Sequence, residues 1–295
     1  MIDDNSKEFI KRHIGPSEDD QSKMLQYVGY NSLDELMQNT VPEKILLKDN
    51  LKIDQPLSEN DALKKLKIIS KKNKIFKNFI GMGYYNSITP NVILRNILEN
   101  PGWYTSYTPY QPEVAQGRLE MLLNFQQTII DLTGMDIANA SLLDEATATA
   151  EAVGLSQRLD KTDSKKIFIS SNCNPQTIDL IKTRTKPFGL ELIIGDEKKE
   201  LPKISADIIC GVLSYPGSLG EIQDPSEAIS LIHKKNGKAI LICDLLALTR
   251  LKTPAELGAD IAVGSAQRFG IPMGYGGPHA AFFATKEEFK RSMPG

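Results

Sequence analysis

Residues 239–270 read AILICDLLALTRLKTPAELGADIAVGSAQRFG and contain the features that decide the fold. The apolar run AILIC ends at Asp244, and a second apolar run, DIAVGS, follows at 260–265 after the short helical turn TPAELG. Short continuous apolar runs are typical of strands that are covered on both faces. A polar residue directly after such a strand lies at the sheet edge where open α/β sheets bind ligands.

The same alternation continues on both sides of this stretch. Strands are expected at KIFIS (166–170), LELII (190–194), DIICGVLSYP (207–216) and AAFFAT (280–285), and helices at PQTIDLIKTRTK (175–186) and DPSEAISLIHKKNG (224–237). The amphipathic run 118–135 predicts a further helix that ends near Gly134. Strands that alternate with helices imply an α/β fold with a mostly parallel sheet and helices on both faces.

The first 117 residues have a different character. Residues 1–78 are expected to form a helical extension, in which Ser17 and Ser58 are typical helix N-caps with acidic residues after them. Residues 79–117 are rich in Gly, Pro and Tyr, which predicts loops with fixed turns rather than regular elements. Such a long aromatic loop needs a surface to pack on or a ligand to bind. The large domain is then expected to span 118–295.

Composition excludes several classes of protein. The formal net charge of −2 argues against a nucleic-acid partner, which would favour a basic face. The three cysteines are far apart without CxxC spacing, so neither a zinc site nor a disulfide framework is expected. The start has no apolar signal segment, and no apolar run approaches about 18 residues, so we expect no membrane span. These features together favour the cytoplasm.

Two stretches could carry chemistry, and each has a simpler alternative. In SLLDEATATAEA (141–152) a helix is expected to begin at Ala146–Thr147, and free N–H groups there could hold a phosphate. Asp144 and Glu145 would oppose an anion, and ordinary helix capping is the alternative. Asp244 could pair with the protonated ring nitrogen of a cofactor, or it could simply begin a turn.

The glycine-rich stretch GSAQRFGIPMGYGGPHAAFFAT (264–285) contains neither a P-loop nor a dinucleotide fingerprint, which argues against a nucleotide-binding enzyme. A helix-start loop, a strand-end Asp and a polar residue before a glycine-rich loop follow the order found in fold-type I enzymes that use pyridoxal phosphate (PLP). In those enzymes the polar residue is a lysine that forms an imine with the cofactor. Gln267 stands there instead, and residues 253–285 contain no lysine. Neither an amide nor the always-protonated Arg268 can form that imine.

Six runs carry a resemblance to a known family: FIKRHIGPSEDD (9–20), FIGMGYY (79–85), NPGWYTSYTPYQPEVAQGRLEMLLNFQ (100–126), SLLDEATATAEA, CDLLALTRLKTPAELGAD (243–260) and the glycine-rich stretch. The chain resembles the N-terminal part of the P-protein of the glycine cleavage system, glycine dehydrogenase (decarboxylating). The resemblance implies a fold-type I PLP-transferase-like large domain. It also implies two homologous halves, of which only the C-terminal half holds PLP through a lysine. Gln267 would then replace that lysine, and Asp244 and Thr147 would be vestiges of a cofactor site.

The resemblance also implies a function. The family decarboxylates glycine and transfers the aminomethyl group to the oxidised lipoyl arm of the H-protein, releasing carbon dioxide. This chain would supply no catalytic residue and no metal ligand, and would face the lysine-bearing half in a dimer-like arrangement. Tyr107, Thr108, Tyr110, Gly276 and Gly277 are candidates for lining that neighbour's cofactor pocket, although packing at the interface is the alternative.

The chain reaches Gly295 before the small C-terminal domain of this fold appears. We therefore expect a truncated or partial sequence that is inactive alone, with exposed apolar surface and poor solubility. The alternative is a non-catalytic N-terminal subunit of a two-subunit glycine decarboxylase, which would pair with a lysine-bearing partner.

Overall fold

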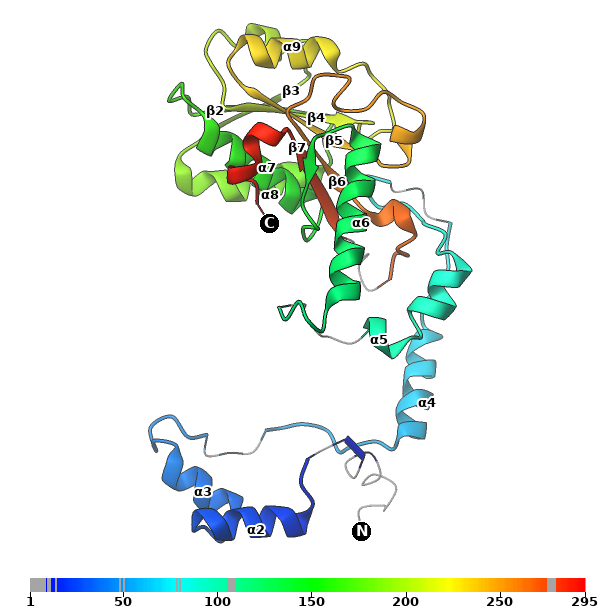
Figure 1. The fold of residues 1–295 in the computed structure, drawn as a ribbon, viewed down its shortest axis with the longest axis vertical. Helices are drawn as coiled ribbons and strands as arrows, with labels where there is room; N and C mark the ends of the chain where they lie inside the picture. Colours follow the sequence, from blue (N-terminus) through cyan, green and yellow to red (C-terminus); the bar gives the residue numbers. More distant parts are fainter. Residues whose placement is uncertain are drawn as a thin grey trace. The chain divides into compact units, whose positions relative to one another are not determined.

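The computed structural model describes residues 9, 12–13, 15–47, 49, 51–77, 79, 81–104, 110–274 and 280–294 of the chain. Its internal contacts divide the chain into two units, residues 1–77 and residues 78–295 (Figure 1).

The described part of residues 1–77 contains the helices α2 (Glu18–Val28), α3 (Leu33–Thr40) and α4 (Glu59–Ser70). A serine caps each of them: the side chains of Ser17, Ser32 and Ser58 accept hydrogen bonds from the backbone N–H three residues later. The caps expected at Ser17 and Ser58 are confirmed. Helix α2 ends at Gly29, whose φ of 84° is the left-handed conformation that glycine adopts without strain. None of the described residues in this unit is buried.

The second unit begins with a segment that is more helical than expected. The turns of the π-helix η2 (Ile93–Ile97) and the short helix α5 (Pro101–Tyr104) interrupt the loops that the composition of 79–117 predicted. The prediction of loops without regular elements was therefore wrong here. Pro101 is the first residue of α5, a position that suits proline because its missing N–H costs nothing there, and the Pro90 carbonyl accepts the N–H groups of Ile93 and Leu94 at the start of η2.

The core of the second unit is a seven-stranded sheet in the order β1-β7-β6-β5-β4-β2-β3. The strands are β1 (Ile137–Ala138), β2 (Lys166–Ser170), β3 (Glu191–Gly195), β4 (Cys210–Tyr215), β5 (Lys238–Cys243), β6 (Ile261–Ser265) and β7 (Ala281–Thr285). Strands β2 to β6 pair in parallel, whereas β7 runs antiparallel to both of its neighbours. The carboxyl ends of β4, β5 and β6 therefore lie side by side at one edge of the sheet.

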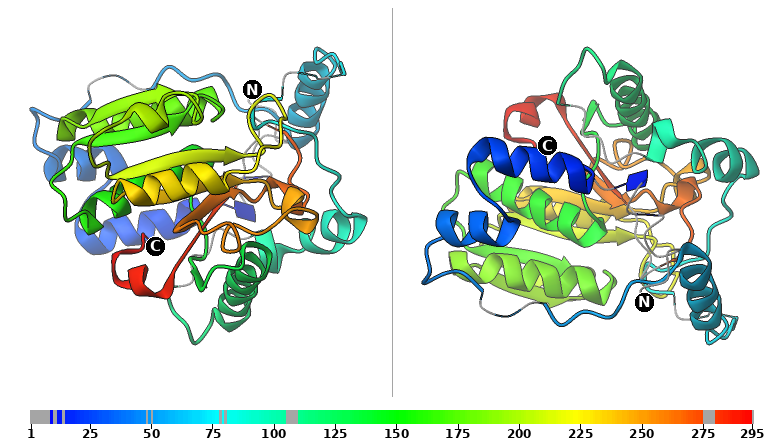
Figure 2. Two further views of the ribbon diagram at one scale, coloured as in Figure 1. Left: turned by 90° about the horizontal axis from the view of Figure 1, so that it is seen from above. Right: turned by 90° about the horizontal axis from the view of Figure 1, so that it is seen from below.

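Helices cover both faces of this sheet, as expected (Figure 2). The long helices are α6 (Gln116–Thr133), α7 (Glu145–Leu159), α8 (Pro175–Thr185) and α9 (Ser226–Lys234). Successive side chains of a strand point to opposite faces. Leu241 therefore packs in the cluster with Ile129 of α6 and Ile229 of α9, while Ile240 packs in the cluster with Val153 of α7 and Ile181 of α8. This double coverage explains why the strands read as continuous apolar runs.

Short 3₁₀ helices connect these elements: η3 (Lys186–Phe188), η4 (Leu201–Lys203), η5 (Ala247–Thr249), η6 (Gln267–Phe269) and η7 (Glu287–Ser292). The expected helix end at Gly134 is confirmed, since this residue is the C-cap of α6 with a φ of 69°. Helix α9 begins at Ser226, whose N–H donates to Asp224 Oδ1 at 2.9 Å. Along the described residues, we find no helix with the length and apolar character needed to cross a bilayer.

Candidate functional site

A cavity of about 260 Å³ lies where β4, β5 and β6 end. Its walls come from three of these strand ends, from the start of α7, from the turn before α8 and from a segment near residue 84. The residues that line it are Gly83, Tyr85, Glu145, Asn174, Ser214, Pro216, Gly217, Gly220, Ile242, Cys243, Asp244, Ser265, Gln267 and Arg268. The sheet topology thus brings together the strand-end residues that the sequence singled out.

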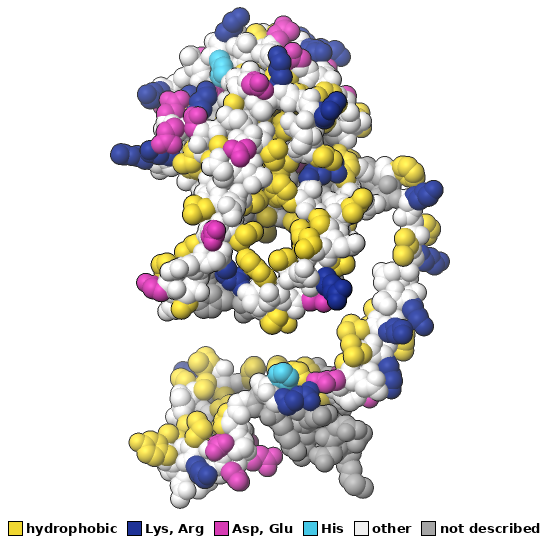
Figure 3. Space-filling view, turned by 45° about the vertical axis from the view of Figure 1, so that its right-hand side comes forward, with side chains coloured by type: hydrophobic (Ala, Val, Ile, Leu, Met, Phe, Trp, Pro, Cys, Tyr) yellow, Lys and Arg dark blue, Asp and Glu magenta, His cyan; other side chains and the backbone are white. Residues whose placement is uncertain are grey.

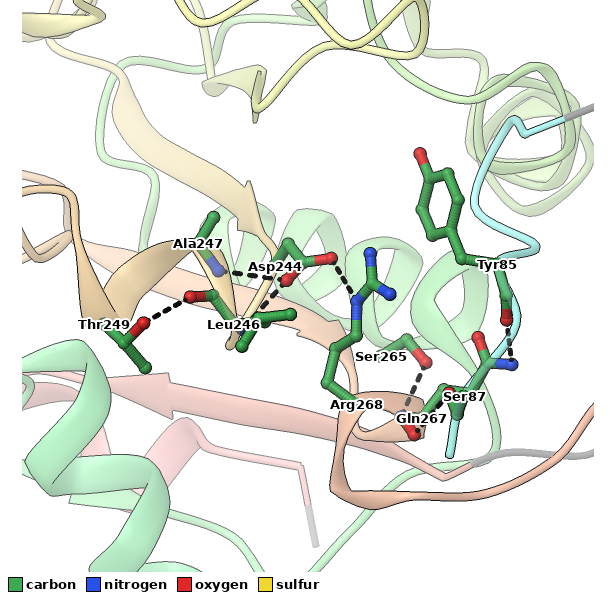
Figure 4. A network of polar contacts seen from close by, with 9 residues as sticks. All are labelled: Tyr85, Ser87, Asp244, Leu246, Ala247, Thr249, Ser265, Gln267 and Arg268. Carbon is green, nitrogen blue, oxygen red and sulfur yellow. Dashed lines mark hydrogen bonds and ion pairs between the residues drawn. The ribbon is translucent and has the colours of Figure 1, made fainter. Parts of the chain in front are cut away.

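Asp244 follows β5 and uses both carboxylate oxygens. Its Oδ1 accepts the backbone N–H groups of Leu246 at 2.8 Å and Ala247 at 3.1 Å. Its Oδ2 accepts the Nε–H of Arg268 at 2.7 Å (Figure 4). Asp244 therefore begins a turn, as one of the two interpretations proposed, and also faces the cavity.

Gln267 occupies the position where the resemblance implies a lysine. It lies in η6 and is only 3% exposed. Its amide nitrogen donates to the backbone carbonyl of Tyr85 at 2.8 Å, and its own backbone carbonyl accepts from Ser87 at 3.2 Å (Figure 4). The glutamine side chain thus joins the segment around Tyr85 to the edge of the sheet through a hydrogen bond.

Arg268 is the residue of this cavity whose role the sequence analysis missed. Its Nε–H donates to Asp244, and its guanidinium lies 4.6 Å from the centre of the Tyr85 ring (Figure 4). An arginine stacked on an aromatic ring and paired with a carboxylate is held in one orientation. The available signal was its place directly after Gln267 at the end of β6, opposite a strand-end carboxylate.

Glu145 begins α7 and also lines the cavity. Its Oε1 accepts hydrogen bonds from Asn174 Nδ2 at 2.9 Å and from Thr177 Oγ1 at 3.2 Å. Burial raises the pKa of this carboxyl, and repulsion from Asp144 and Asp244 adds to the shift, while the two hydrogen bonds oppose it. The Glu145 carboxyl group therefore takes up a proton at a higher pH than a surface glutamate does.

The helix start at Thr147 is occupied by its own cap. Asp144 Oδ1 accepts the N–H of Thr147 at 2.7 Å, which is the capping alternative for this loop. Thr147 is not among the residues that line the cavity. Its assignment as a vestige of a phosphate site stays a prediction.

The remaining candidates are not brought to the cavity by the described structure. Tyr110 is 88% exposed and does not line it. Tyr107, Thr108, Gly276 and Gly277 lie outside the described residues. Their proposed role at a neighbouring pocket stays a prediction, as does the interface packing that is its alternative.

The lining residues do not fit a covalently held aldehyde cofactor. None of them is a lysine, so no amine is available for an imine. The two carboxyl groups at the start of α7 would also repel a phosphate. In the part of the chain that the structure covers, no group of three or more His, Cys, Asp or Glu side chains could hold a metal ion.

Comparison with known proteins gives a consistent family. The family described as Glycine cleavage system P-protein matches residues 11–295. Glycine dehydrogenase (decarboxylating) from Pelagibacter ubique (strain HTCC1062) is 74% identical over 295 residues, which are 100% of this chain and 31% of that protein. The enzyme of the same name from Nostoc sp. (strain PCC 7120 / SAG 25.82 / UTEX 2576) is 56% identical over 97% of this chain and 29% of that protein. The chain thus spans less than a third of the length of these curated relatives.

Solved structures agree with this result. A crystal structure of glycine decarboxylase (P-protein) of the glycine cleavage system, in inhibitor-bound form, has a TM-score of 0.87 and 33% identity, covering 96% of this chain and 64% of that chain. The expected fold is thereby confirmed. Sphingosine-1-phosphate lyase Bpss2021 from Burkholderia pseudomallei K96243 has a TM-score of 0.63 at 11% identity, covering 85% of this chain and 63% of that chain, which is a likeness of fold alone.

Proposed function

The chain belongs to the glycine cleavage system P-protein family, and from this membership we propose that it is the lysine-less, N-terminal part of a glycine decarboxylase. The complete enzyme would convert glycine and the oxidised lipoyl H-protein into aminomethyl H-protein and carbon dioxide. The lysine-bearing half would hold PLP. This chain would contribute shape and an interface, and would be inactive alone.

Gln267 is the observation that carries the proposal. It stands at the end of β6, in the place of the family's lysine, and its side chain is occupied by the Tyr85 carbonyl. An amide in that place cannot form the imine through which PLP is held. The proposal that another half must supply the reactive amine rests on this substitution.

Exposed apolar side chains that neighbour the cavity-lining residues in the sequence support a covered interface. Each of five lies within two residues of a residue that lines the cavity: Tyr84, Leu143, Leu219, Leu246 and Phe269. Hydrophobic side chains also gather around a hollow on one face of residues 78–295 (Figure 3). Exposed apolar patches with polar surroundings are typical of protein–protein interfaces. We call the surface formed by these five side chains the rim. We assign the rim to the interface with the lysine-bearing half.

The second candidate is a natural N-terminal subunit of a two-subunit enzyme, placed in a dimer of unlike chains. One observation favours it: the matching crystal structure has a chain of which this sequence covers 64%, against 31% for the Pelagibacter relative. The reading frame downstream of residue 295 distinguishes the two candidates. A continuous frame supports the longer protein, and a separate lysine-bearing frame supports the two-subunit form.

We also place the protein in the cytoplasm. The three cysteines are all free and buried, without a disulfide among the described residues. Thiols that stay reduced are usual in the cytosol.

The test is reconstitution of activity. The chain is mixed with the remaining, lysine-bearing part of the Pelagibacter relative, and the exchange of labelled carbon dioxide into glycine is measured in the presence of PLP and H-protein. We expect no exchange from the chain alone, no absorbance of an imine that borohydride reduces, and at least a tenfold gain on mixing. Exchange by the chain alone, or no gain on mixing, contradicts the proposal.

A matched pair of variants distinguishes the loss of the interface from a general loss of folding. Leu219→Asp places a charge on the rim at the carboxyl edge of the sheet, so the gain on mixing should fall at least tenfold. Phe188→Asp is the control, because Phe188 is also an exposed apolar residue (64%, against 89% for Leu219) but precedes β3 at the opposite, amino edge of the sheet. Equal effects of the two variants would contradict the assignment of the rim.

A further inference from the structure

Arg268 presents an unused pair of donors at the cavity. Its Nε–H is committed to Asp244, but neither of its terminal amino groups bonds to any residue that the structure describes. The Arg268 guanidinium lies over the Tyr85 ring, 4.6 Å from its centre, and the Arg268 side chain is 24% exposed (Figure 4). A guanidinium held from one side, with its terminal N–H groups free, is the arrangement that receives a carboxylate.

Glu145 presents an unused acceptor in the same cavity. Both of its hydrogen bonds, from Asn174 and Thr177, end on Oε1. Its Oε2 has no partner among the described residues. Glu145 is half-buried and lines the cavity, so this oxygen is the one left for a ligand. A single free carboxylate oxygen favours a donor with positive charge, such as an ammonium group.

The charges around the cavity discriminate between classes of ligand. Asp244 already neutralises Arg268, so a phosphate or a dicarboxylate would bring uncompensated negative charge close to Glu145 and Asp144. A ligand with one carboxylate and one ammonium group adds no net charge and matches both ends. The about 260 Å³ of space restricts such a ligand to a small molecule.

We propose that this cavity is a binding site for a small zwitterionic α-amino acid, whose carboxylate lies on the terminal amino groups of Arg268 and whose ammonium group lies on Glu145 Oε2. The site belongs to the lysine-less chain itself and is separate from the pocket proposed for the partner half. A bound amino acid would stabilise the arrangement of Arg268, Tyr85 and Gln267, so this arrangement would depend on the amino acid concentration.

Two features of this binding follow from the chemistry. Burial raises the pKa of Glu145, and an ammonium group on its Oε2 would oppose that shift because it favours the charged carboxylate. Binding should therefore strengthen as pH rises through that pKa. Ile242 and Pro216 give the cavity an apolar wall, so a methyl side chain should be tolerated.

The experiment is calorimetric titration of the 295-residue chain with glycine, alanine, methylamine, acetate and inorganic phosphate at neutral pH. Glycine and alanine should bind with one site per chain. Methylamine and acetate, which each lack one charged end, should bind at least tenfold more weakly. The absence of saturable glycine binding would overturn the proposal, as would acetate or phosphate binding as tightly as glycine.

Variants then test the two ends separately. Glu145→Gln keeps an acceptor but removes the charge, and Arg268→Gln removes the guanidinium, so each should weaken glycine binding at least tenfold. Arg184→Gln is the control, because Arg184 pairs with Glu151 at the surface away from this cavity. Unchanged affinity in Glu145→Gln and Arg268→Gln would overturn the assignment. The comparison of ligands on the unaltered chain tests the proposal even where a variant fails to fold.

Discussion

Residues 1–77 and residues 78–295 use the same local signals but differ in what their helices pack against. Helices α2, α3 and α4 are capped by serines and begin with acidic residues, yet none of the described residues around them is buried. Helix α7 has an equally good cap, Asp144, and buries eight of its 15 residues. The comparison shows that capping decides where a helix begins, whereas its stability depends on the surface behind it.

The exposed apolar residues of the first unit have a physical consequence. Leu63, Leu66 and Ile69 recur at helical spacing on α4 and are all exposed. Such a stripe normally packs against another element. We therefore expect residues 1–77 to be the less stable unit of the isolated chain, with most of the cooperative unfolding coming from residues 78–295.

Truncation of a core side chain should give the largest difference between the units. Phe282→Ala removes a fully buried ring from β7 and should lower the free energy of unfolding by about 4 kcal/mol. Leu66→Ala in α4, where the side chain is 61% exposed, should change it by less than about 0.5 kcal/mol. Urea denaturation followed by circular dichroism measures both. A cost for Leu66→Ala close to that of Phe282→Ala would show that the first unit buries this face.

Substitution of glycine should separate close packing from backbone conformation. A Cβ at Gly264 would lie 2.2 Å from the Cys243 carbonyl oxygen and 2.7 Å from the Phe282 ring, so Gly264→Ala should cost about 3 kcal/mol. A Cβ at Gly29 meets nothing within 4 Å, but its φ of 84° strains any other residue, and Gly29→Ala should cost about 1 kcal/mol.

The two glycine substitutions should also affect different parts of the unfolding curve. Gly264→Ala should lower the urea midpoint of the global unfolding transition. Gly29→Ala should change only the part of the helical signal that is lost at urea concentrations below that transition. A global shift in Gly29→Ala would contradict the separation of the two units.

A buried carboxylate should make the second unit sensitive to acid. Asp260 accepts hydrogen bonds from His233 at 2.8 Å and Lys286 at 2.5 Å, besides the N–H of Ala239 at 2.8 Å. Burial alone would raise the pKa of Asp260, but these bonds outweigh it and lower the pKa to about 2. The stabilisation, about 2 kcal/mol, is present above the unfolded pKa of about 3.9 and is lost as the pH falls towards 2.

The urea midpoint as a function of pH tests this expectation. Asp260→Asn should be less stable than the parent chain at pH 6, and the gap should close between about pH 4 and pH 2. Asp61 in α4 is the control: its pKa is lowered by a hydrogen bond from Ser58, but the group is exposed, so Asp61→Asn should leave the midpoint unchanged. A gap that is independent of pH would contradict the role of the Asp260 charge.

Removal of a helix cap should give the smallest effect. Ser58 Oγ accepts the N–H of Asp61 at 3.2 Å, and Ser58→Ala should destabilise α4 locally by about 1 kcal/mol. Hydrogen exchange of the α4 amides should then accelerate without a shift in the global transition. Ser58→Asp restores an acceptor and is the matched control. Unchanged exchange in Ser58→Ala would show that packing rather than the cap stabilises α4.

Much of this architecture could be predicted because its causes are local. The strands at 166–170 and 261–265 are apolar runs, the end of α6 is a glycine, and the N-caps are serines that act within three residues. The antiparallel direction of β7 and the two-residue strand β1 could not be predicted, because pairing partners lie far apart in the sequence: Ile137 pairs with Thr285.

The sequence by itself determined that Gln267 follows this strand and that residues 253–285 contain no lysine, because residue identities need no coordinates. It also determined the strand-end position of Asp244. Only the tertiary structure decided what these residues do. The bond from Gln267 to Tyr85 spans 182 positions, and the pairing of Arg268 with Asp244 joins the ends of two parallel strands. Such contacts depend on the order and register of the strands, which arise from packing the whole sheet rather than from any local pattern.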